Sequence, residues 1–515
     1  MKKLEDYAIV MAPSLDQVAI AKVEIAQGEN LEYMGQAITI LEKINRGHRF
    51  TVRDVPDGEF VRQNGYTFGQ SAGIEKGRKI SQANIRCLLP KPDNGGFETP
   101  APAVLKDKYL NTAFQGYRRS NGAAGTRNYY LVVPTSMCVS ETALQVALKM
   151  DAQADMANRY PNIDGIVAIP NTEGCGCAST GGQIDRFLTV LKGFVNHPNV
   201  GGCLIMDLGC EQTNYERVHE YLSDNSDGSG KPIDWITVQQ SGGTRLAQEK
   251  AERIILSKLE MVNDVKREAI PLGKLIVGTE CGGSDSFSGI TANPVIGNMA
   301  DKVIFGGGAA IMSEVPEMLG TYSMLLPRFR SLEVARKFQL AIDWYLGMAD
   351  KLGLNISDNL VPKNIEGGII NSYIKSLGAV LKGGTTVIED VIGYGEPVGE
   401  RGLYVMQGPG GDLESLTGLV SSGANIICFS TGYGAISGNA ICPVIKISSN
   451  DETYGKMPED MDFNAGRVIS ENIGLEDMGD ELLAFVVAVA SGRKTNTEKL
   501  KQRQFQVWTA GKLSL

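Results

Sequence analysis

The 515-residue sequence contains no apolar run of the length that crosses a bilayer. Two lysines follow the initial methionine, but no apolar segment comes after them, so we expect neither a signal peptide nor a membrane partner. Cysteine and histidine are scarce, at nine and three residues. So few cysteines in so long a chain do not indicate a disulfide framework. We therefore expect a cytoplasmic protein whose cysteines are free thiols or metal ligands.

An excess of positive charge is also absent. Lysine and arginine total 50 against 59 acidic residues, and the net charge of -9 argues against nucleic-acid binding. A small anion can still bind such a chain through local lysine or arginine side chains or helix N-termini. The apolar content of 43% is typical of a globular protein, and the length predicts two to four domains.

Changes of pattern along the chain predict its domain organisation. Residues 1–90 contain short alternating apolar runs between turns, which indicate a small β-rich domain. Residues 91–115 combine prolines and glycines without periodicity, as a linker does. Residues 116–270 and 271–515 alternate apolar runs with helical patterns. This order predicts the α/β class, with two mainly parallel, doubly wound α/β domains after the β-rich one.

Four of the predicted strands are each followed within a few residues by a cysteine: Cys138, Cys175, Cys210 and Cys281. The carboxyl ends of parallel strands gather along one edge of a sheet, where such folds bind ligands. Cysteines that only fill a core have no reason to prefer that edge. We therefore expect the four thiols to share one site, with the loop of residues 281–285 at its centre.

The chain resembles the altronate/galactarate dehydratase family. The resemblance rests on motifs that follow one another over nearly the whole chain, among them Gly116-Tyr117-Arg118-Arg119, Gly174-Cys175-Gly176, Leu208-Gly209-Cys210-Glu211, Cys281-Gly282-Gly283-Ser284-Asp285 and Ser313-Glu314. It implies that residues 1–90 form a SAF-type β-clip domain, that the substrate is an aldonic acid or sugar diacid, and that iron is the metal. A related member eliminates sulfite from sulfolactate, which makes a carbon–sulfur lyase an alternative.

One run of residues departs from the pattern of that family. Its N-terminal domain usually ends in His-x-His-Asn, whereas this chain has Ser81-Gln82-Ala83-Asn84. Both histidines are missing, while His48 and Asn84 remain. A non-catalytic protein that binds sugar acids is therefore a second alternative.

Dehydration of a 2,3-dihydroxy acid sets three chemical requirements: a base for the proton next to the carboxylate, positive charge to stabilise the enolate, and a Lewis acid to help hydroxide leave. Iron, as Fe²⁺ or as an iron–sulfur cluster with an open position, could be held by Cys175, Cys210 and Cys281, with Cys138 as a fourth candidate. The candidate bases are His48, Asp285 and Glu314. The candidate substrate-binding residues are Arg127, Lys375, Lys446 and Asn84.

These observations together predict a hydro-lyase that converts a sugar acid into a 2-keto-3-deoxy acid. We expect a small anionic substrate and a homo-oligomer, most simply a dimer. An NAD-dependent or phosphosugar enzyme would fit the same class of fold. The glycine-rich loops of this chain, however, match neither a dinucleotide fingerprint nor a Walker A motif.

Overall fold

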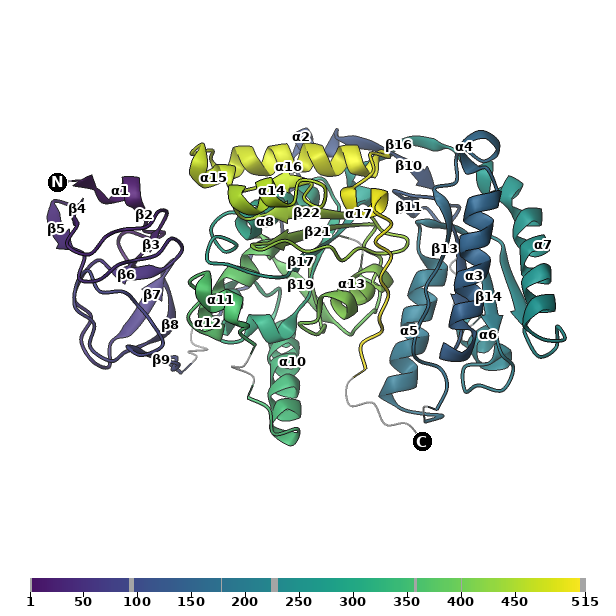
Figure 1. The fold of residues 1–515 in the computed structure, drawn as a ribbon, viewed down its shortest axis with the longest axis horizontal. Coiled ribbons are helices and arrows are strands. Elements are labelled where there is room, and N and C mark those ends of the chain that lie inside the picture. The colour runs from purple at the N-terminus through teal and green to yellow at the C-terminus, as the bar shows by residue number, and fades with distance from the viewer. Residues whose placement is uncertain are drawn as a thin grey trace.

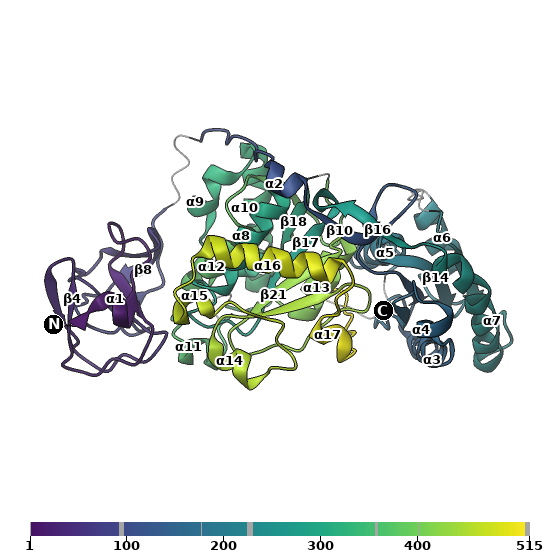
Figure 2. The same cartoon turned by 90° about the horizontal axis from the view of Figure 1, so that it is seen from above.

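The computed structural model describes residues 2–91, 97–176, 178–223, 230–355, 359–399 and 401–509. Three domains lie in a row, and their order in space differs from their order in the chain (Figures 1 and 2). The C-terminal domain, built on residues 272–509, occupies the middle. The N-terminal domain (2–91) and the second domain (129–263) flank it at opposite ends.

The N-terminal domain consists of three small sheets, each of three strands. Its elements are β1 (Lys2–Lys3), α1 (Leu4–Tyr7), β2 (Ala8–Ile9), β3 (Val18–Ala21), β4 (Asn30–Tyr33), β5 (Gln36–Thr39), β6 (Arg49–Thr51), β7 (Phe60–Gln63), β8 (Tyr66–Ser71) and β9 (Ile85–Arg86). Part of its core is shared with the C-terminal domain. Phe68 and Ile80 belong to the same buried cluster as Ile369 and Ile374, so the two domains meet across an apolar contact, which we call the seam.

The second domain is a four-stranded parallel sheet in the order β13-β12-β14-β15. Its strands are β12 (Tyr129–Pro134), β13 (Gly165–Ala168), β14 (Val200–Asp207) and β15 (Ile233–Thr237), and its helices are α3 (Met137–Gln153), α4 (Met156–Arg159), α5 (Gly182–Asn196), α6 (Tyr215–Ser223) and α7 (Thr244–Asn263). The helices α3 and α7 cover one face and α5 the other. Every residue of β14 is buried, as expected for a parallel strand covered on both faces.

A small antiparallel sheet joins the second domain to the C-terminal one. It consists of β10 (Ala113–Arg118), β11 (Ala124–Gly125) and β16 (Arg267–Pro271), and β10 is its middle strand. The short helix α2 (Asp107–Leu110) precedes it.

The C-terminal domain is organised around a seven-stranded, fully parallel sheet in the order β19-β20-β18-β17-β21-β22-β23. Its strands are β17 (Ile276–Cys281), β18 (Ala309–Met312), β19 (Ile388–Ile392), β20 (Gly402–Met406), β21 (Ile426–Thr431), β22 (Val444–Ser448) and β23 (Phe463–Asn464). The chain leaves β17 towards β18 on one side and later continues into β21 on the other. The boundary between β17 and β21 is therefore the topological switch point, where sheets of this type bind ligands.

Helices cover both faces of this sheet. They are α8 (Ala292–Phe305), α9 (Tyr322–Leu325), α10 (Leu332–Lys351), α11 (Pro362–Glu366), α12 (Ser372–Ala379), α13 (Asp412–Ser421), α14 (Asp451–Lys456), α15 (Arg467–Ser470), α16 (Leu475–Ala490) and α17 (Asn496–Lys499), with the 3-10 turns η1 (Leu272–Lys274), η2 (Val315–Met318), η3 (Leu326–Arg328) and η5 (Val380–Gly383). The predicted fold class, a β-rich N-terminal domain followed by parallel α/β domains, is confirmed.

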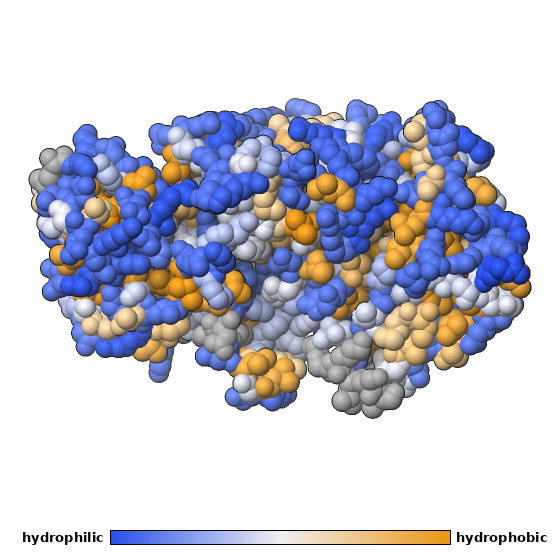
Figure 3. Space-filling view, in the orientation of Figure 1, coloured by the Kyte–Doolittle hydropathy of each residue, from blue (hydrophilic) through white to orange (hydrophobic). Residues whose placement is uncertain are grey.

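In the described part of the chain, no helix combines the length and the apolar character that spanning a bilayer requires. On the face shown in Figure 3, hydrophilic residues predominate and apolar residues form small separate patches.

Candidate active site

A group of buried ionisable side chains lies at the carboxyl edge of the seven-stranded sheet, beside the switch point. Glu280 and Cys281 are the last two residues of β17. Glu314 lies two residues after β18 and has a positive φ of 70°, which is uncommon for a residue with a side chain. Glu317 belongs to the short turn η2 that follows. The ends of adjacent parallel strands thus bring these groups together.

A thiol and two carboxyl groups form the centre of this group. Cys281, Glu314 and Glu317 are all buried, and each places a potential ligand atom within 4.8 Å of the other two. The Sγ atom of Cys281 lies 3.8 Å from Glu314 and 3.4 Å from Glu317, and the Cys281 N–H donates to Glu314 at 3.1 Å. Thiolate and carboxylate ligands together suit Zn²⁺ or Fe²⁺. We call these three residues the Cys281 group.

Two lysines lie against the Cys281 group. Lys382, from η5, is fully buried, forms an ion pair with Glu314 and places its Nζ atom 3.1 Å from the Cys281 Sγ. Lys375, from α12, forms an ion pair with Glu317 at 2.8 Å. The positive charges of Lys375 and Lys382 therefore lie beside the Cys281 group, where they could attract a small anion.

A third lysine extends the site along the sheet. Glu280, Phe429 and Lys446 are paired neighbours on β17, β21 and β22, so their side chains share one face. The Nζ atom of Lys446 lies 3.3 Å from the centre of the Phe429 ring and makes no hydrogen bond to any described residue. One carboxylate oxygen of Glu280 accepts from Ser415 at 2.5 Å, and the other is buried without a partner in the described residues.

Burial shifts the pKa of several members of the site. It raises the pKa of Glu314 to about 8, and it raises the pKa of Glu280 and of Asp412. It lowers the pKa of Lys446 to about 7. Burial also opposes the charge of Lys382, but the neighbouring Cys281 and Glu314 raise the pKa of this lysine above its ordinary value.

The pKa values of Glu280 and Glu314 are raised chiefly because burial disfavours the charged carboxylates, and neighbouring carboxyl groups add to this effect. A divalent cation bound beside them would favour their charged forms. The donor atoms of the Cys281 group therefore fit a bound metal ion.

The other three predicted metal ligands lie in a different domain. Cys138 is in the first turn of α3, Cys175 follows β13 and Cys210 follows β14, all at the carboxyl edge of the four-stranded sheet. Hydrogen bonds hold their loops together, since the Thr213 hydroxyl donates to the carbonyls of Thr135 at 2.6 Å and Gly174 at 3.0 Å.

These three cysteines are neighbours of one another. Burial raises the pKa of Cys138, and the nearby thiols of Cys175 and Cys210 raise it further. The prediction of one site shared by all four cysteines is nevertheless wrong. The sheet-edge argument holds within one sheet, whereas Cys281 ends a strand of another sheet, and its side-chain partners are Glu314, Glu317 and Lys382.

Arg127 is not available to bind a substrate, which corrects the prediction. Its Nε and Nη2 atoms donate to the two carboxylate oxygens of Glu498 at 2.6 and 2.8 Å. Its remaining N–H groups donate to the carbonyls of Thr126, Val489 and Arg493. All five donors are used, and the side chain is fully buried, so Arg127 joins parts of the structure and does not face a cavity.

Three further candidates lie outside the Cys281 group. His48 precedes β6, and its Nε2 atom lies 3.0 Å from the Glu366 carbonyl while burial lowers its pKa. Asp285 accepts hydrogen bonds from Ser288, Ser449 and Asn450 and thereby fixes the loop after Cys281. This position favours an orienting role for Asp285 over that of a base.

Asn84 closes a local turn, because its side chain donates to the Lys79 carbonyl and accepts from the Ser81 N–H. Its predicted role in substrate binding is therefore not supported by its position.

The sequence reasoning missed several members of the site. Glu280 directly precedes Cys281, and Glu317 lies three residues after Glu314, so the motifs that contain Cys281 and Glu314 could have identified both residues. No local signal marks Lys382 or Asp412, which the packing of η5 and α13 brings to the sheet edge.

The fold and the site together define a class of protein: a multidomain α/β enzyme with a buried acid–base centre that could hold a metal ion. Family models match three consecutive segments. They are the altronate/galactarate dehydratase SAF domain at residues 7–88, the second domain of D-galactarate dehydratase/altronate hydrolase at 116–263, and the C-terminal domain of D-galactarate/altronate dehydratase at 272–513.

Individual relatives agree with these matches. The altronate dehydratase of Bacillus subtilis (strain 168) is 32% identical over 96% of this chain and 97% of its own length. The galactarate dehydratase (L-threo-forming) of Escherichia coli (strain K12) is 30% identical over 89% and 88%. The (2R)-sulfolactate sulfo-lyase subunit beta of Chromohalobacter salexigens is 30% identical over 76% of this chain and 96% of its own length. The chain belongs to the altronate/galactarate dehydratase family, which confirms the predicted family and its SAF domain.

Proposed function

We propose that this protein is a hydro-lyase that removes water from a sugar acid, an aldonate or aldarate such as altronate or galactarate, to give a 2-keto-3-deoxy acid. The main support from the geometry is the Cys281 group with its two lysines. Burying several ionised groups together is unfavourable for stability unless every one is fully paired, and here they are not. A chemical role accounts for such a group better than an architectural one.

Lys446 is the residue that we assign as the base. A general base works best when its pKa lies near the operating pH, and burial lowers the pKa of Lys446 to about 7. Its amine makes no hydrogen bond to a described residue and is free to take the proton next to the substrate carboxylate. Lys382, whose pKa is raised, keeps its charge and can stabilise the enolate that forms.

We further propose that the Cys281 group holds iron. When bound there, Fe²⁺ would supply a Lewis acid for the departing hydroxide. Cys281, Glu314 and Glu317 supply the donor atoms, and Lys375 lies beside them to attract the substrate's negative charge. The resemblance to the family favours iron over zinc, which the same donor atoms also suit.

An iron-binding role for Cys138, Cys175 and Cys210 stays a prediction. Its support is that hydrogen-bonded loops bring the three thiols near one another. Their sulfur atoms do not all lie within 4.8 Å of one another, which suits an iron–sulfur cluster better than one ion.

Iron analysis of alanine variants separates the two sites. Protein reconstituted without oxygen should lose iron in Cys281→Ala and keep it in Cys428→Ala, a buried cysteine outside both sites. If Cys210→Ala loses both its iron and its inorganic sulfide, an iron–sulfur cluster is assigned to the second domain. Full retention of iron in Cys281→Ala would overturn the Cys281 group as its site.

The activity itself is tested by incubating the purified protein and Fe²⁺, without oxygen, with altronate, galactarate and sulfolactate. We expect a 2-keto-3-deoxy acid from a sugar acid, and none from Cys281→Ala. Release of sulfite from sulfolactate alone would support the carbon–sulfur lyase, which is the less favoured reading because that relative covers less of this chain. Binding without turnover would support a non-catalytic protein.

A cytoplasmic homodimer is part of the proposal, and sedimentation equilibrium tests the dimer.

A further inference from the structure

The N-terminal domain places one buried arginine in the seam. Arg49, the first residue of β6, is 3% exposed. Its Nε atom donates to Gln63 at 2.5 Å, and its Nη1 atom donates to the Ser286 hydroxyl at 2.9 Å and to the Gly368 carbonyl at 2.7 Å. Within the described ranges, its Nη2 atom makes no hydrogen bond. Two of its five N–H donors are thus left without a partner among the described residues.

No carboxylate within the described ranges compensates the charge of Arg49. Burial alone lowers its pKa to about 9, whereas the other fully buried arginine, Arg127, is paired with Glu498. A buried cation without a counter-ion is strongly unfavourable. The neighbouring His48 repeats the pattern, because its Nδ1 atom is buried with no partner in the described structure. The seam is therefore incompletely satisfied on the side of the N-terminal domain.

Arg49 faces a small polar cavity next to the Cys281 group. The cavity has a volume of about 20 Å³, and Lys375, Asp285 and Asn293 line it together with Arg49. Lys375 connects the two sites, since it forms its ion pair with Glu317, which lies 3.4 Å from the Cys281 Sγ. The carboxylate of Asp285 is already engaged with Ser288, Ser449 and Asn450. The guanidinium of Arg49 therefore lines the cavity without a carboxylate partner among the described residues.

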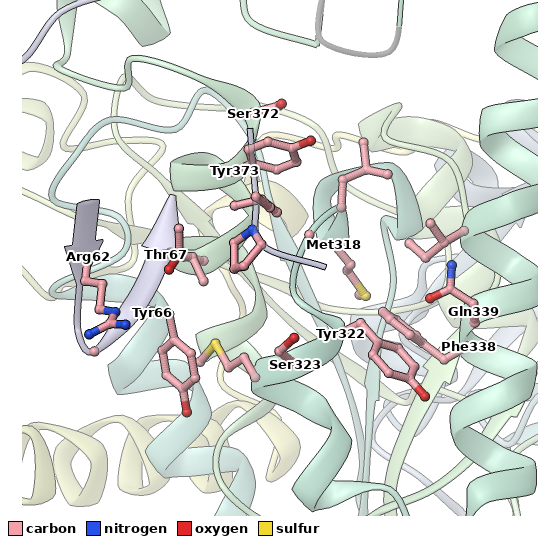
Figure 4. A pocket seen from close by; sticks show the side chains of 18 of the residues that line it. Arg62, Tyr66, Thr67, Met318, Tyr322, Ser323, Phe338, Gln339, Ser372 and Tyr373 are labelled. Carbon is pink, nitrogen blue, oxygen red and sulfur yellow. The ribbon is translucent and has the colours of Figure 1, made fainter. Parts of the chain in front are cut away.

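Two larger pockets also lie between the N-terminal and C-terminal domains. One pocket, of about 500 Å³, is lined by Arg62 and Tyr66 of the N-terminal domain and by Met318 and Tyr322 of the C-terminal domain (Figure 4). A second pocket, of about 580 Å³, also lies between residues of these two domains. Because the polar cavity has room for about one water molecule, a sugar acid can enter only if the two domains separate.

We propose that Arg49 binds a carboxylate of the sugar acid and that the N-terminal domain closes over the bound substrate through this contact. A carboxylate would complete the guanidinium fork at Nη2 and supply the missing negative charge. This inference rests on the proposed function for the identity of the substrate. It assigns to the N-terminal domain a binding residue that does not depend on the missing histidines of the Ser81–Asn84 run.

The test compares ligand-induced thermal stabilisation in three proteins: the native chain, Arg49→Gln and Arg53→Gln. Arg53 is the control, because it lies in the same domain but pairs with Glu59 on the surface. Galactarate is titrated beside galactitol, which has the same carbon skeleton and no carboxylate. We expect galactarate, and not galactitol, to raise the Tm. Arg49→Gln should need about 10- to 100-fold more galactarate, the range of one charged hydrogen-bonded contact, and Arg53→Gln should behave as the native chain.

A purely structural role for Arg49 predicts a different result. Arg49→Gln would then have a lower Tm without ligand but an unchanged dependence on galactarate, and this outcome overturns the proposal. If Arg49→Gln does not fold, Arg49→Lys replaces it, because lysine keeps the positive charge and lacks the guanidinium fork. The galactarate dependence of Arg49→Lys should lie between those expected for the native chain and for Arg49→Gln.

Turnover distinguishes this inference from the proposed function. If sugar acids are dehydrated and the KM of Arg49→Gln is unchanged, the carboxylate contact is wrong and the function stands. If the native chain is inactive but galactarate stabilises it only when Arg49 is present, the contact stands and the function falls.

Discussion

Two buried ion pairs of the described structure, Arg127–Glu498 and Lys382–Glu314, differ in character. In both, the side chains are less than 10% exposed. The first pair has every donor of its cation matched to an acceptor. The second lies among further carboxyl groups and a thiol, within a group that includes an unpaired oxygen on Glu280.

The pKa values follow this difference. Burial opposes the charge of Glu498, but Arg127 more than offsets it and lowers the pKa of Glu498 to about 2. For Glu314, burial outweighs the attraction of Lys382, and the pKa rises to about 8. A buried ion pair that is fully matched belongs to the architecture. A buried pair whose carboxyl group has a pKa above its ordinary value in water is suited to binding a cation or transferring a proton.

The largest expected effect comes from breaking the matched pair. Arg127→Met leaves the Glu498 carboxylate buried without its guanidinium partner and with only the more exposed Lys494 3.6 Å away, so we expect the free energy of unfolding to fall by about 3–5 kcal/mol. Urea denaturation at neutral pH measures this change. The control is Arg118→Met, whose ion pair with Glu268 is on the surface and should contribute less than about 1 kcal/mol. An equal effect of the two substitutions would remove the distinction between the pairs.

The same variant should change the stability at low pH. Because the pKa of Glu498 is lowered from 4.5 to about 2, this carboxylate stabilises the folded chain above pH 4.5, and the contribution is lost as the pH falls towards 2. Arg127→Met should show a weaker dependence in that window.

Neutralising the unmatched pair should have the opposite pattern. In the double variant Lys382→Met/Glu314→Gln we expect kcat/KM to fall by about 10²- to 10³-fold, because the charge next to the reacting substrate is gone. The urea midpoint should change far less than in Arg127→Met, since both members of the ion pair are neutralised together and neither leaves a buried charge behind. Circular dichroism verifies the fold. A variant that unfolds, or one that keeps its activity, would assign this pair to the architecture as well.

The sequence allowed the strands to be placed better than the partners of their side chains. The apolar runs before Cys138, Cys210 and Cys281 correctly indicated strands that end at a sheet edge. Which sheet each strand joins depends on packing between distant segments, and the cysteines therefore fell into two groups instead of one. The local pattern of a strand contains no information on its neighbours.

Arg127 and Arg49 also show that the sequence does not reveal the partners of a side chain. Arg127 was predicted to bind substrate because the sequence does not reveal that Glu498, 371 residues away, becomes its partner. Arg49 went unnoticed in the sequence because its significance depends on the absence of such a partner. Both conclusions require the contacts between domains, which no motif encodes.

A single lysine that has no ion pair in the described structure extends the comparison. Because burial lowers the pKa of Lys446 from 10.5 to about 7, the unfolded chain holds one more proton than the folded chain between these values. The stability of the native protein should therefore rise as the pH increases from 7 to 10.5, and Lys446→Met should lack this contribution. Urea denaturation at pH 7 and pH 9.5 measures the difference, with the exposed Lys456→Met as control.

Activity provides the second measurement for the same residue. If neutral Lys446 takes the substrate proton, kcat/KM should fall about tenfold for each pH unit below 7 and level off above it. Lys446→Met should be inactive yet folded, and no less stable than the native chain at pH 7, since it removes a buried amine that has no hydrogen bond in the described structure. An active Lys446→Met with the native pH profile would transfer the role of base to another member of the site. The contrast between matched and unmatched buried charges would then rest on Glu314 and Lys382 alone.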